Sequence, residues 1–79
     1  MARVTLLYFA SLRDAAGIGS ESVEASGDLA SLYAAARERH GFALPLQRLR
    51  VAVDGEFARW TDAVREGAEV AFIPPVSGG

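Results

Sequence analysis

The sequence predicts an α+β fold in which a mixed sheet wraps around one main helix. Two features of the 79-residue chain indicate this fold. Only residues 28–41 combine a helix-capping residue, a long apolar helical stripe and a glycine stop. Much of the remaining chain consists of short runs rich in β-branched, aromatic and aliphatic residues, separated by turn signals, as is typical of strands.

The N-terminal part is predicted to form a strand, a short helix and a second strand. Residues 3–9 (RVTLLYF) have the composition of a strand whose two faces are both largely apolar. Residues 10–16 can form a short helix that ends at Gly17. Residues 21–25 then form a short strand, which we expect to pair with the first through a hairpin-like connection.

The main helix is expected to begin after Asp28 and to end at Gly41. The carboxylate of Asp28 can accept from the free amides of the first turn. The apolar residues that follow have the spacing of one buried stripe: Leu29, Leu32, Tyr33 and Ala36. Basic residues fill the last turns, where they compensate the helix dipole: Arg37, Arg39 and His40.

Three further strands are predicted after the helix. Residues 49–53 alternate as a half-buried strand, and Asp54-Gly55 is a strong tight-turn signal. Residues 57–60 can return as a short strand, and residues 69–73 form the last one. With the helix supplying the crossover that a mixed sheet needs, this order is the arrangement of the β-grasp (ubiquitin-like) fold.

Composition limits the possible functions. Residues 1–79 have the size and hydrophobic content of a single globular domain. The chain lacks cysteine and lysine. Its net charge of −2 does not provide the positive electrostatic potential that binds nucleic acid. There is no membrane-length apolar run and no signal peptide pattern, so we expect a soluble, cytoplasmic protein with no membrane partner.

The polar residues do not form a recognisable catalytic or metal-binding motif. His40 is explained by its place at the helix end, and neither a Ser–His–Asp arrangement nor metal-ligand spacing is present. Residues 17–20 lack the lysine and the context of a phosphate loop. Tyr33 and Trp60 are interpreted as packing residues. We therefore expect no bound metal or cofactor and no stand-alone enzyme.

One face of the predicted sheet is left open and is apolar. Strand alternation places Leu7, Phe9, Ala52 and Ile73 on it, and Phe57 is expected to join them. Monomers seldom expose such patches without a partner, and aromatic anchors are typical of interface cores. The alternative, that these residues are the core, is less favoured because the opposite face already supplies one: Val4, Leu6, Tyr8, Val51, Val53, Val70 and Phe72.

The C-terminal residues 74–79 (PPVSGG) are expected to form a flexible tail outside the domain. Pro74 and Pro75 remove backbone donors and direct the chain outward in an extended conformation, which reaches at most about 20 Å. Gly78 and Gly79 have no side chains, so the tip can enter a slot that admits only backbone. We prefer this interpretation to a functionless disordered end because the tail follows directly on the last strand.

Both ends of the chain resemble the small subunits of molybdopterin synthase, which are ubiquitin-like sulfur carriers. Residues 4–13 (VTLLYFASLR) are similar to the family's strand followed by Phe-Ala-x-x-Arg. Residues 67–79 (GAEVAFIPPVSGG) closely match its closing motif, and Phe-x-Pro-Pro-Val-[Ser/Thr]-Gly-Gly is more specific than Gly-Gly alone. The chain departs from the family in lacking lysine, which removes any family contact that a lysine would make.

The resemblance implies a sulfur carrier in molybdenum cofactor biosynthesis. A ubiquitin-activating-like adenylyltransferase would use ATP to adenylate the Gly79 carboxylate, and a sulfur donor protein would convert it to a thiocarboxylate. The tail would then deliver sulfur to cyclic pyranopterin monophosphate in the large subunit of a heterotetrameric synthase. The implied partner contacts are Phe9, Arg13, Phe57, Ile73, Pro74, Pro75, Val76 and Ser77, with Gly78 beside the reactive Gly79.

Two alternatives keep a reactive C-terminus but change its use. The first is a sulfur carrier for thiamine, cysteine or tRNA thiolation; thiamine-type carriers tend to be shorter and generally lack the Pro-Pro pair. The second is a ubiquitin-like modifier that is conjugated to the lysines of other proteins. The sequence does not exclude dual use.

Overall fold

The computed structural model describes residues 1–75 and contains one five-stranded sheet, two α-helices and a 3₁₀ turn. Residues 76–79 are not described. In chain order the elements are β1 (Ala2–Tyr8), α1 (Ala10–Ala16), β2 (Ser20–Ala25), α2 (Leu29–His40), η1 (Leu46–Arg48), β3 (Arg50–Val53), β4 (Glu56–Ala58) and β5 (Glu69–Ile73).

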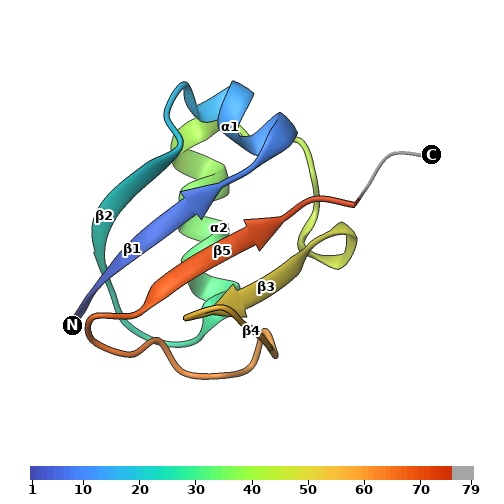
Figure 1. Ribbon diagram of the computed structural model, residues 1–79. Helices are drawn as coiled ribbons and strands as arrows, with labels where there is room; N and C mark the ends of the chain where they lie inside the picture. Colours follow the sequence, from blue (N-terminus) through green and yellow to red (C-terminus); the bar gives the residue numbers. More distant parts are fainter. Residues whose placement is uncertain (76–79) are drawn as a thin grey trace.

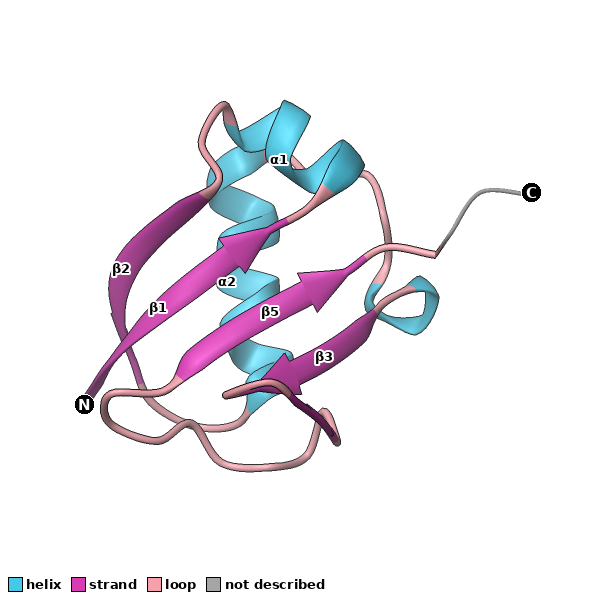
Figure 2. Ribbon diagram, viewed as in Figure 1, coloured by secondary structure: helices cyan, strands magenta, loops and turns pink. Residues whose placement is uncertain are grey.

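The sheet has the order β2-β1-β5-β3-β4, so the first and last strands of the chain lie side by side at its centre. β1 and β5 are parallel, while the other neighbouring pairs are antiparallel. Helix α2 crosses one face of this sheet, and no helix within residues 1–75 covers the other face (Figure 1). Helix α1 connects β1 to β2, a tight turn connects β3 to β4, and a longer loop over residues 59–68 connects β4 to β5 (Figure 2). The predicted α+β fold with one main helix is confirmed.

Helix α2 begins and ends where its capping residues predict. Asp28 Oδ1 accepts from the Ser31 amide at 2.9 Å, and Gly41, with φ of 72°, donates its amide to the Arg37 carbonyl at 2.7 Å. The predicted stripe is the buried side of the helix: Leu29, Leu32, Tyr33 and Ala36. Within residues 1–75, neither helix has the length and apolar character required to cross a bilayer.

The core lies between α2 and the sheet and is built around aromatic rings. Phe72 of β5 is fully buried, with the Tyr33 ring at 5.0 Å and the Trp60 ring at 6.0 Å, measured between centroids. The Tyr33 hydroxyl donates to the Leu44 carbonyl at 2.7 Å, so its burial leaves no unpaired polar group. The interpretation of Tyr33 and Trp60 as packing residues is confirmed.

Several predicted strand boundaries are wrong by one or two residues. β1 ends at Tyr8 rather than Phe9, because the chain turns into α1 with Phe9 as its N-cap. β4 ends at Ala58 rather than Trp60, because Trp60 packs on the core while its carbonyl accepts from the Ala30 amide. Strand β3 begins at Arg50 because residues 46–48 form the 3₁₀ turn, which was not predicted.

Candidate functional site

The C-terminal tail follows β5, the middle strand of the sheet. β5 ends at Ile73, and Pro74 and Pro75 follow without regular structure. A surface groove of about 380 Å³ runs beside these prolines, and we call it the tail groove. Its lining residues are Gln47, Arg48, Leu49, Arg50, Phe57, Ile73, Pro74 and Pro75. The predicted site residues Val76, Ser77, Gly78 and Gly79 lie outside the described residues.

An apolar surface on the open face of the sheet adjoins the tail groove. It surrounds a shallow hollow of about 280 Å³, and Phe57 and Phe9 are 68% and 46% exposed there. The hollow is also bordered by Gly55 and Glu69. We call its apolar side chains the open-face patch: Leu7, Phe9, Ala52, Phe57, Ala71 and Ile73.

Strand register explains why these side chains meet. Ala71 of β5 lies between Leu7 of β1 and Ala52 of β3, and Ala52 lies opposite Phe57 of β4. Side chains of paired residues point to the same face, whereas the next residue along each strand points to the core. Val70 and Phe72, which flank Ala71, are accordingly fully buried. Ala52 is on the predicted face but only 8% exposed, so its neighbours cover it.

Charged groups border the open-face patch at its two ends. Near the tail, the Arg50 guanidinium lies over the Phe57 ring, 5.4 Å from its centroid, and Arg50 is paired in register with Ile73. At the opposite end, Glu69 lines the hollow, and its amide donates to Asp54 Oδ1 at 2.9 Å. The patch is therefore flanked by a cation at the tail end and by carboxylates at the far end.

The structure brings most of the described candidate residues together, but not all of them. Phe9, Phe57 and Ile73 share the open-face patch, and Pro74 and Pro75 adjoin it in the tail groove. Arg13 does not line either surface, because its side chain extends along the loop after α1, close to Gly19.

Sequence reasoning missed Ala71, Arg48 and Arg50. Alternation from Ile73 and Ala52 predicts that Ala71 and Arg50 share the open face. No comparable local pattern identifies Arg48, because it lies in the 3₁₀ turn that was not predicted.

A separate polar cluster joins β2 to the end of α2. Glu21 accepts from the Tyr8 hydroxyl and from Arg39 at 3.0 Å, and its carboxylate lies 2.6 Å from His40 Nε2. Burial alone would raise the pKa of the Glu21 carboxyl, but hydrogen bonds from Tyr8, His40 and Arg39 outweigh it and lower the pKa to about 2. Burial, reinforced by Glu21, raises the pKa of Tyr8 well above its usual range. This cluster fastens the edge strand to the helix.

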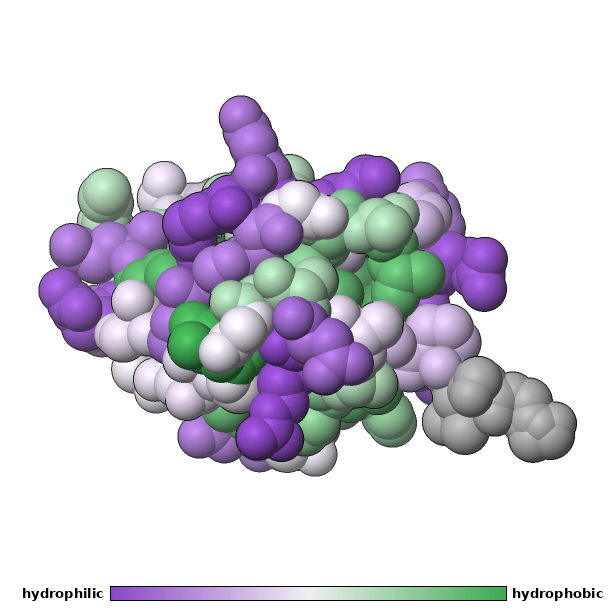
Figure 3. Space-filling view, turned by 90° about the horizontal axis from the view of Figure 1, so that it is seen from above, coloured by the Kyte–Doolittle hydropathy of each residue, from purple (hydrophilic) through white to green (hydrophobic). Residues whose placement is uncertain are grey.

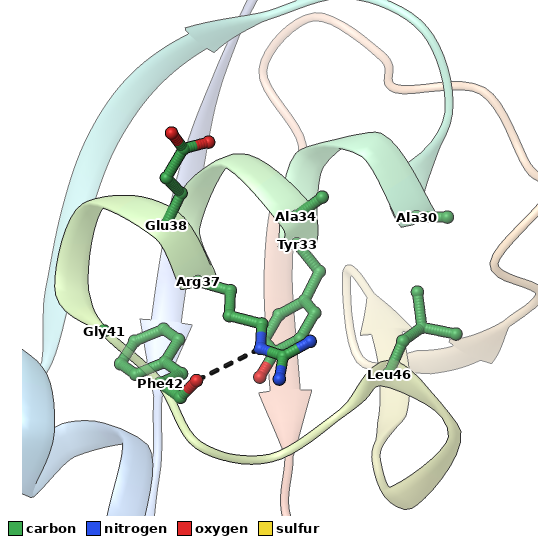
Figure 4. A pocket seen from close by; sticks show the side chains of 8 residues that line it. All are labelled: Ala30, Tyr33, Ala34, Arg37, Glu38, Gly41, Phe42 and Leu46. Atoms are coloured by element: carbon green, nitrogen blue, oxygen red, sulfur yellow. Dashed lines mark hydrogen bonds between the residues drawn. The ribbon is translucent and has the colours of Figure 1, made fainter.

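A second hollow lies on the helix side of the molecule, between α2 and η1 (Figure 4). Tyr33, Arg37 and Leu46 extend toward it, and Arg37 Nε donates to the Phe42 carbonyl at 3.1 Å. The Arg37 guanidinium is thus already hydrogen-bonded at the wall of the hollow, and Ala30 and Ala34 line its helix side. These lining residues do not form a convergent set of reactive groups. From the end that carries α1, the surface shows green apolar patches separated by hydrophilic side chains (Figure 3).

The chain is similar in sequence to known proteins over nearly its whole length. Residues 6–79 match the sequence profile of the ThiS family. The chain is 33% identical to the molybdopterin synthase sulfur carrier subunit of Haemophilus influenzae, with 96% of this chain and 99% of that protein aligned.

Two solved structures have a similar fold. The crystal structure of Haloferax volcanii small archaeal modifier protein 1 superimposes with a TM-score of 0.81 at 26% identity, over 96% of this chain and 100% of that one. A chain in the structure of the complex of subunits 1 and 2 of Helicobacter pylori molybdopterin-converting factor superimposes with a TM-score of 0.70 at 22% identity, over 98% of this chain and 99% of that one. The second likeness concerns the fold alone. Both support the predicted β-grasp fold.

Proposed function

We propose, from the premise that this chain belongs to the ThiS family, that it is the sulfur carrier subunit of a molybdopterin synthase. The observation that carries the proposal is the position of the tail. A central strand, β5, ends at Ile73 in the open-face patch, and Pro74 and Pro75 follow directly. A partner that docks on the patch therefore meets the chain where the Val76–Gly79 segment begins.

The chemistry assigned to Gly79 follows from the reactivity of carboxylates. A carboxylate resists nucleophiles, so an activating enzyme first joins it to the AMP of ATP and releases pyrophosphate. A sulfur donor protein then supplies sulfur at the sulfide level, which forms a bond to the carbonyl carbon as the bond to AMP breaks, and a C-terminal thiocarboxylate and free AMP result. This group is ionised at neutral pH, and its soft sulfur is a good nucleophile. The chain has no cysteine, so no internal thiol competes for the carried sulfur.

The proposed acceptor is cyclic pyranopterin monophosphate, bound by the large subunit of the synthase. Two successive sulfur transfers would build the dithiolene of molybdopterin, with the large subunit supplying most pocket residues. The relative in Haemophilus influenzae is itself a subunit of a synthase, and the Helicobacter pylori structure is a complex of two subunits. Both support a large-subunit partner for this chain. ATP is a substrate of the activating enzyme, and the carrier is not proposed to bind a cofactor of its own.

The proposal is tested by loading the carrier and following the sulfur. Incubation with the cognate activating enzyme, ATP and a sulfur donor should raise the intact mass by the difference between one sulfur and one oxygen atom. Adding the large subunit and the pterin substrate should return the carrier to its original mass as molybdopterin forms. A chain lacking Gly79 is the matched control. A carrier that gains no mass with a demonstrably active enzyme contradicts the proposal.

A second candidate is a ubiquitin-like protein modifier, which the likeness to small archaeal modifier protein 1 favours. It uses the same adenylated Gly79 but joins it to a lysine of another protein. The protein has no lysine, so copies of it cannot be conjugated to one another through their side chains. Mass spectrometry of cell proteins after expression of a tagged carrier distinguishes the two: a modifier leaves Gly79 in isopeptide bonds, whereas a dedicated sulfur carrier leaves none.

A further inference from the structure

The open-face patch by itself does not determine how a partner is oriented on it. Its contacts are apolar, and the hydrophobic effect is non-directional. A partner rotated in the plane of the sheet would cover much the same surface. Such a partner would, however, miss the chain where it leaves β5 through Pro74 and Pro75. Productive docking of a tail-binding partner therefore needs a second, directional feature.

The charged residues around the patch supply that direction. Arg50 stands beside Ile73 at the tail end, and Arg48 lines the tail groove with the two prolines. Glu69 and Asp54 stand at the opposite end of the same two strands. From Ile73 to Glu69 the chain advances about 13 Å, at about 3.3 Å per residue. Positive and negative groups thus occupy opposite ends of one small apolar surface.

These charges are available to a partner. Within residues 1–75, none of Arg48, Arg50, Asp54 and Glu69 takes part in an ion pair. The nearest basic residue along the open face of β1, Arg3, is engaged by Glu24 at 3.6 Å and by Ser22 at 3.4 Å. Its charge is therefore directed toward β2 rather than toward Glu69.

Arg50 is also tied to the aromatic anchor of the patch. Its guanidinium lies over the Phe57 ring, the most exposed aromatic side chain in residues 1–75. A partner that covers Phe57 must therefore also cover much of Arg50. Burying an unpaired cation is strongly unfavourable, so a partner without an opposing carboxylate would be rejected.

We propose that the open-face patch is electrostatically polarised and that this polarity orients the large subunit so that the tail meets its acceptor site. The partner surface that fits has a carboxylate opposite Arg50 and Arg48, beside the point where the tail enters. It has a basic group opposite Glu69 and Asp54, at the other end of the docking surface. The inference rests on the proposed function and adds a chemical description of the partner.

A charge-swap variant tests this polarity without changing net charge. R50E combined with E69R leaves one charge of each sign at both ends, because Arg48 and Asp54 remain, so it cancels the polarity and keeps the formal net charge at −2. R59E combined with E38R is the matched control, because both residues are exposed and neither lines the patch or the tail groove. Association of each protein with the large subunit from the same source organism is measured by stopped flow, at low and high salt. The unloaded carboxylate form suffices, so activation is not involved.

At low salt, the swap is expected to slow association about tenfold or more, whereas the control swap stays within about twofold of the parent. In about 1 M salt, screening should reduce the loss to within about threefold. R50K, which keeps the cation, should bind within about threefold of the parent. Thermal melting checks that each variant folds. Should the swap variant unfold, the association rate of R50Q and the salt dependence of the parent's association rate test the polarity instead.

The possible outcomes separate the inference from the proposed function. Equal association of the parent and the swap, or a parent rate that does not change with salt, overturns the polarity and leaves the carrier function standing. A parent that does not bind the large subunit at all overturns the proposed partner and this inference with it. A slower swap whose loss disappears at high salt supports both.

Discussion

Ala52 and Phe57 lie directly opposite each other in the β3–β4 pair, yet Ala52 is 8% exposed and Phe57 is 68% exposed. The short edge strand β4 thus presents a large aromatic ring above a covered alanine. Because most of the Phe57 ring is exposed to solvent, it contributes little to the core and can contribute much to the binding of a partner.

Phe57→Ala is therefore expected to weaken binding of the large subunit by about 1–3 kcal/mol, because an interface anchor is lost. Its free energy of unfolding should change by less than about 1 kcal/mol. Ile18→Ala, another exposed apolar residue at 42% but away from the patch, should leave binding unchanged. Titration calorimetry and urea denaturation of the same proteins measure both quantities.

Phe72→Ala is the complementary variant. Phe72 is fully buried between Tyr33 and Trp60, so its truncation should lower the free energy of unfolding by about 3–5 kcal/mol. If Phe57→Ala destabilised the protein as much as Phe72→Ala and bound normally, the assignment of the two sheet faces would be reversed.

The Glu21 cluster predicts a specific acid sensitivity. The pKa of Glu21 is about 2 in the folded protein, against an ordinary value of 4.5. Because the folded pKa is the lower one, the stability from this carboxylate is fully present above pH 4.5 and is lost as the pH falls toward 2. Glu21→Gln should cost about 1.5–3 kcal/mol at neutral pH and show a smaller further loss in acid.

Urea denaturation followed by Trp60 fluorescence, repeated from pH 7 to pH 2, measures this dependence. Glu24→Gln is the control on the same strand, because its ion pair with Arg3 is exposed and should contribute less than about 1 kcal/mol. Parallel pH profiles for the parent and Glu21→Gln would contradict the assignment.

Ala10 has an unusual backbone conformation for a non-glycine residue, with φ of 50°. This left-handed conformation costs an L-residue about 1–2 kcal/mol, which glycine avoids. Ala10→Gly should thus leave the protein between equally stable and about 1 kcal/mol more stable. Ala34→Gly, in the exposed middle of α2, should instead destabilise it by about 0.5–1 kcal/mol. Thermal denaturation compares the two, and equal losses would show that Ala10 is not strained.

Gly78 lies outside the described residues, and its prediction rests on the chemistry of the tail. If the tip enters a channel that admits only backbone, the methyl group of Gly78→Ala should block sulfur delivery without affecting folding. Binding through the open-face patch should fall only modestly. Gly79→Ala should slow activation more than Gly78→Ala does, since its methyl is on the carbon that bears the carboxylate. Single-turnover product formation, set beside partner affinity, separates these effects; transfer at the parent rate by Gly78→Ala would rule out a narrow channel.

Signals between residues close in sequence were sufficient for the helix and for the tail motif. Asp28 and Gly41 cap α2 through contacts within a few residues, so the helix limits could be predicted from residues 28–41 alone. Alternation within each strand likewise separated Phe72 from Ile73 and predicted which residues face the core. The Pro-Pro-Val-Ser-Gly-Gly ending indicated the chemistry before any fold was known.

Contacts between distant parts of the chain were decided only by the tertiary structure. The parallel pairing of β1 with β5 brings Leu7 beside Ala71, and the edge strand β4 places Phe57 under Arg50. Glu21 likewise meets His40 only because β2 and the end of α2 converge. Local pattern gives each strand its two faces but not its neighbours, because pairing depends on the packing of the whole sheet against α2. The apolar surface was thus predictable from the sequence, whereas the placement of the bordering charges at its two opposite ends required the pairing of the strands.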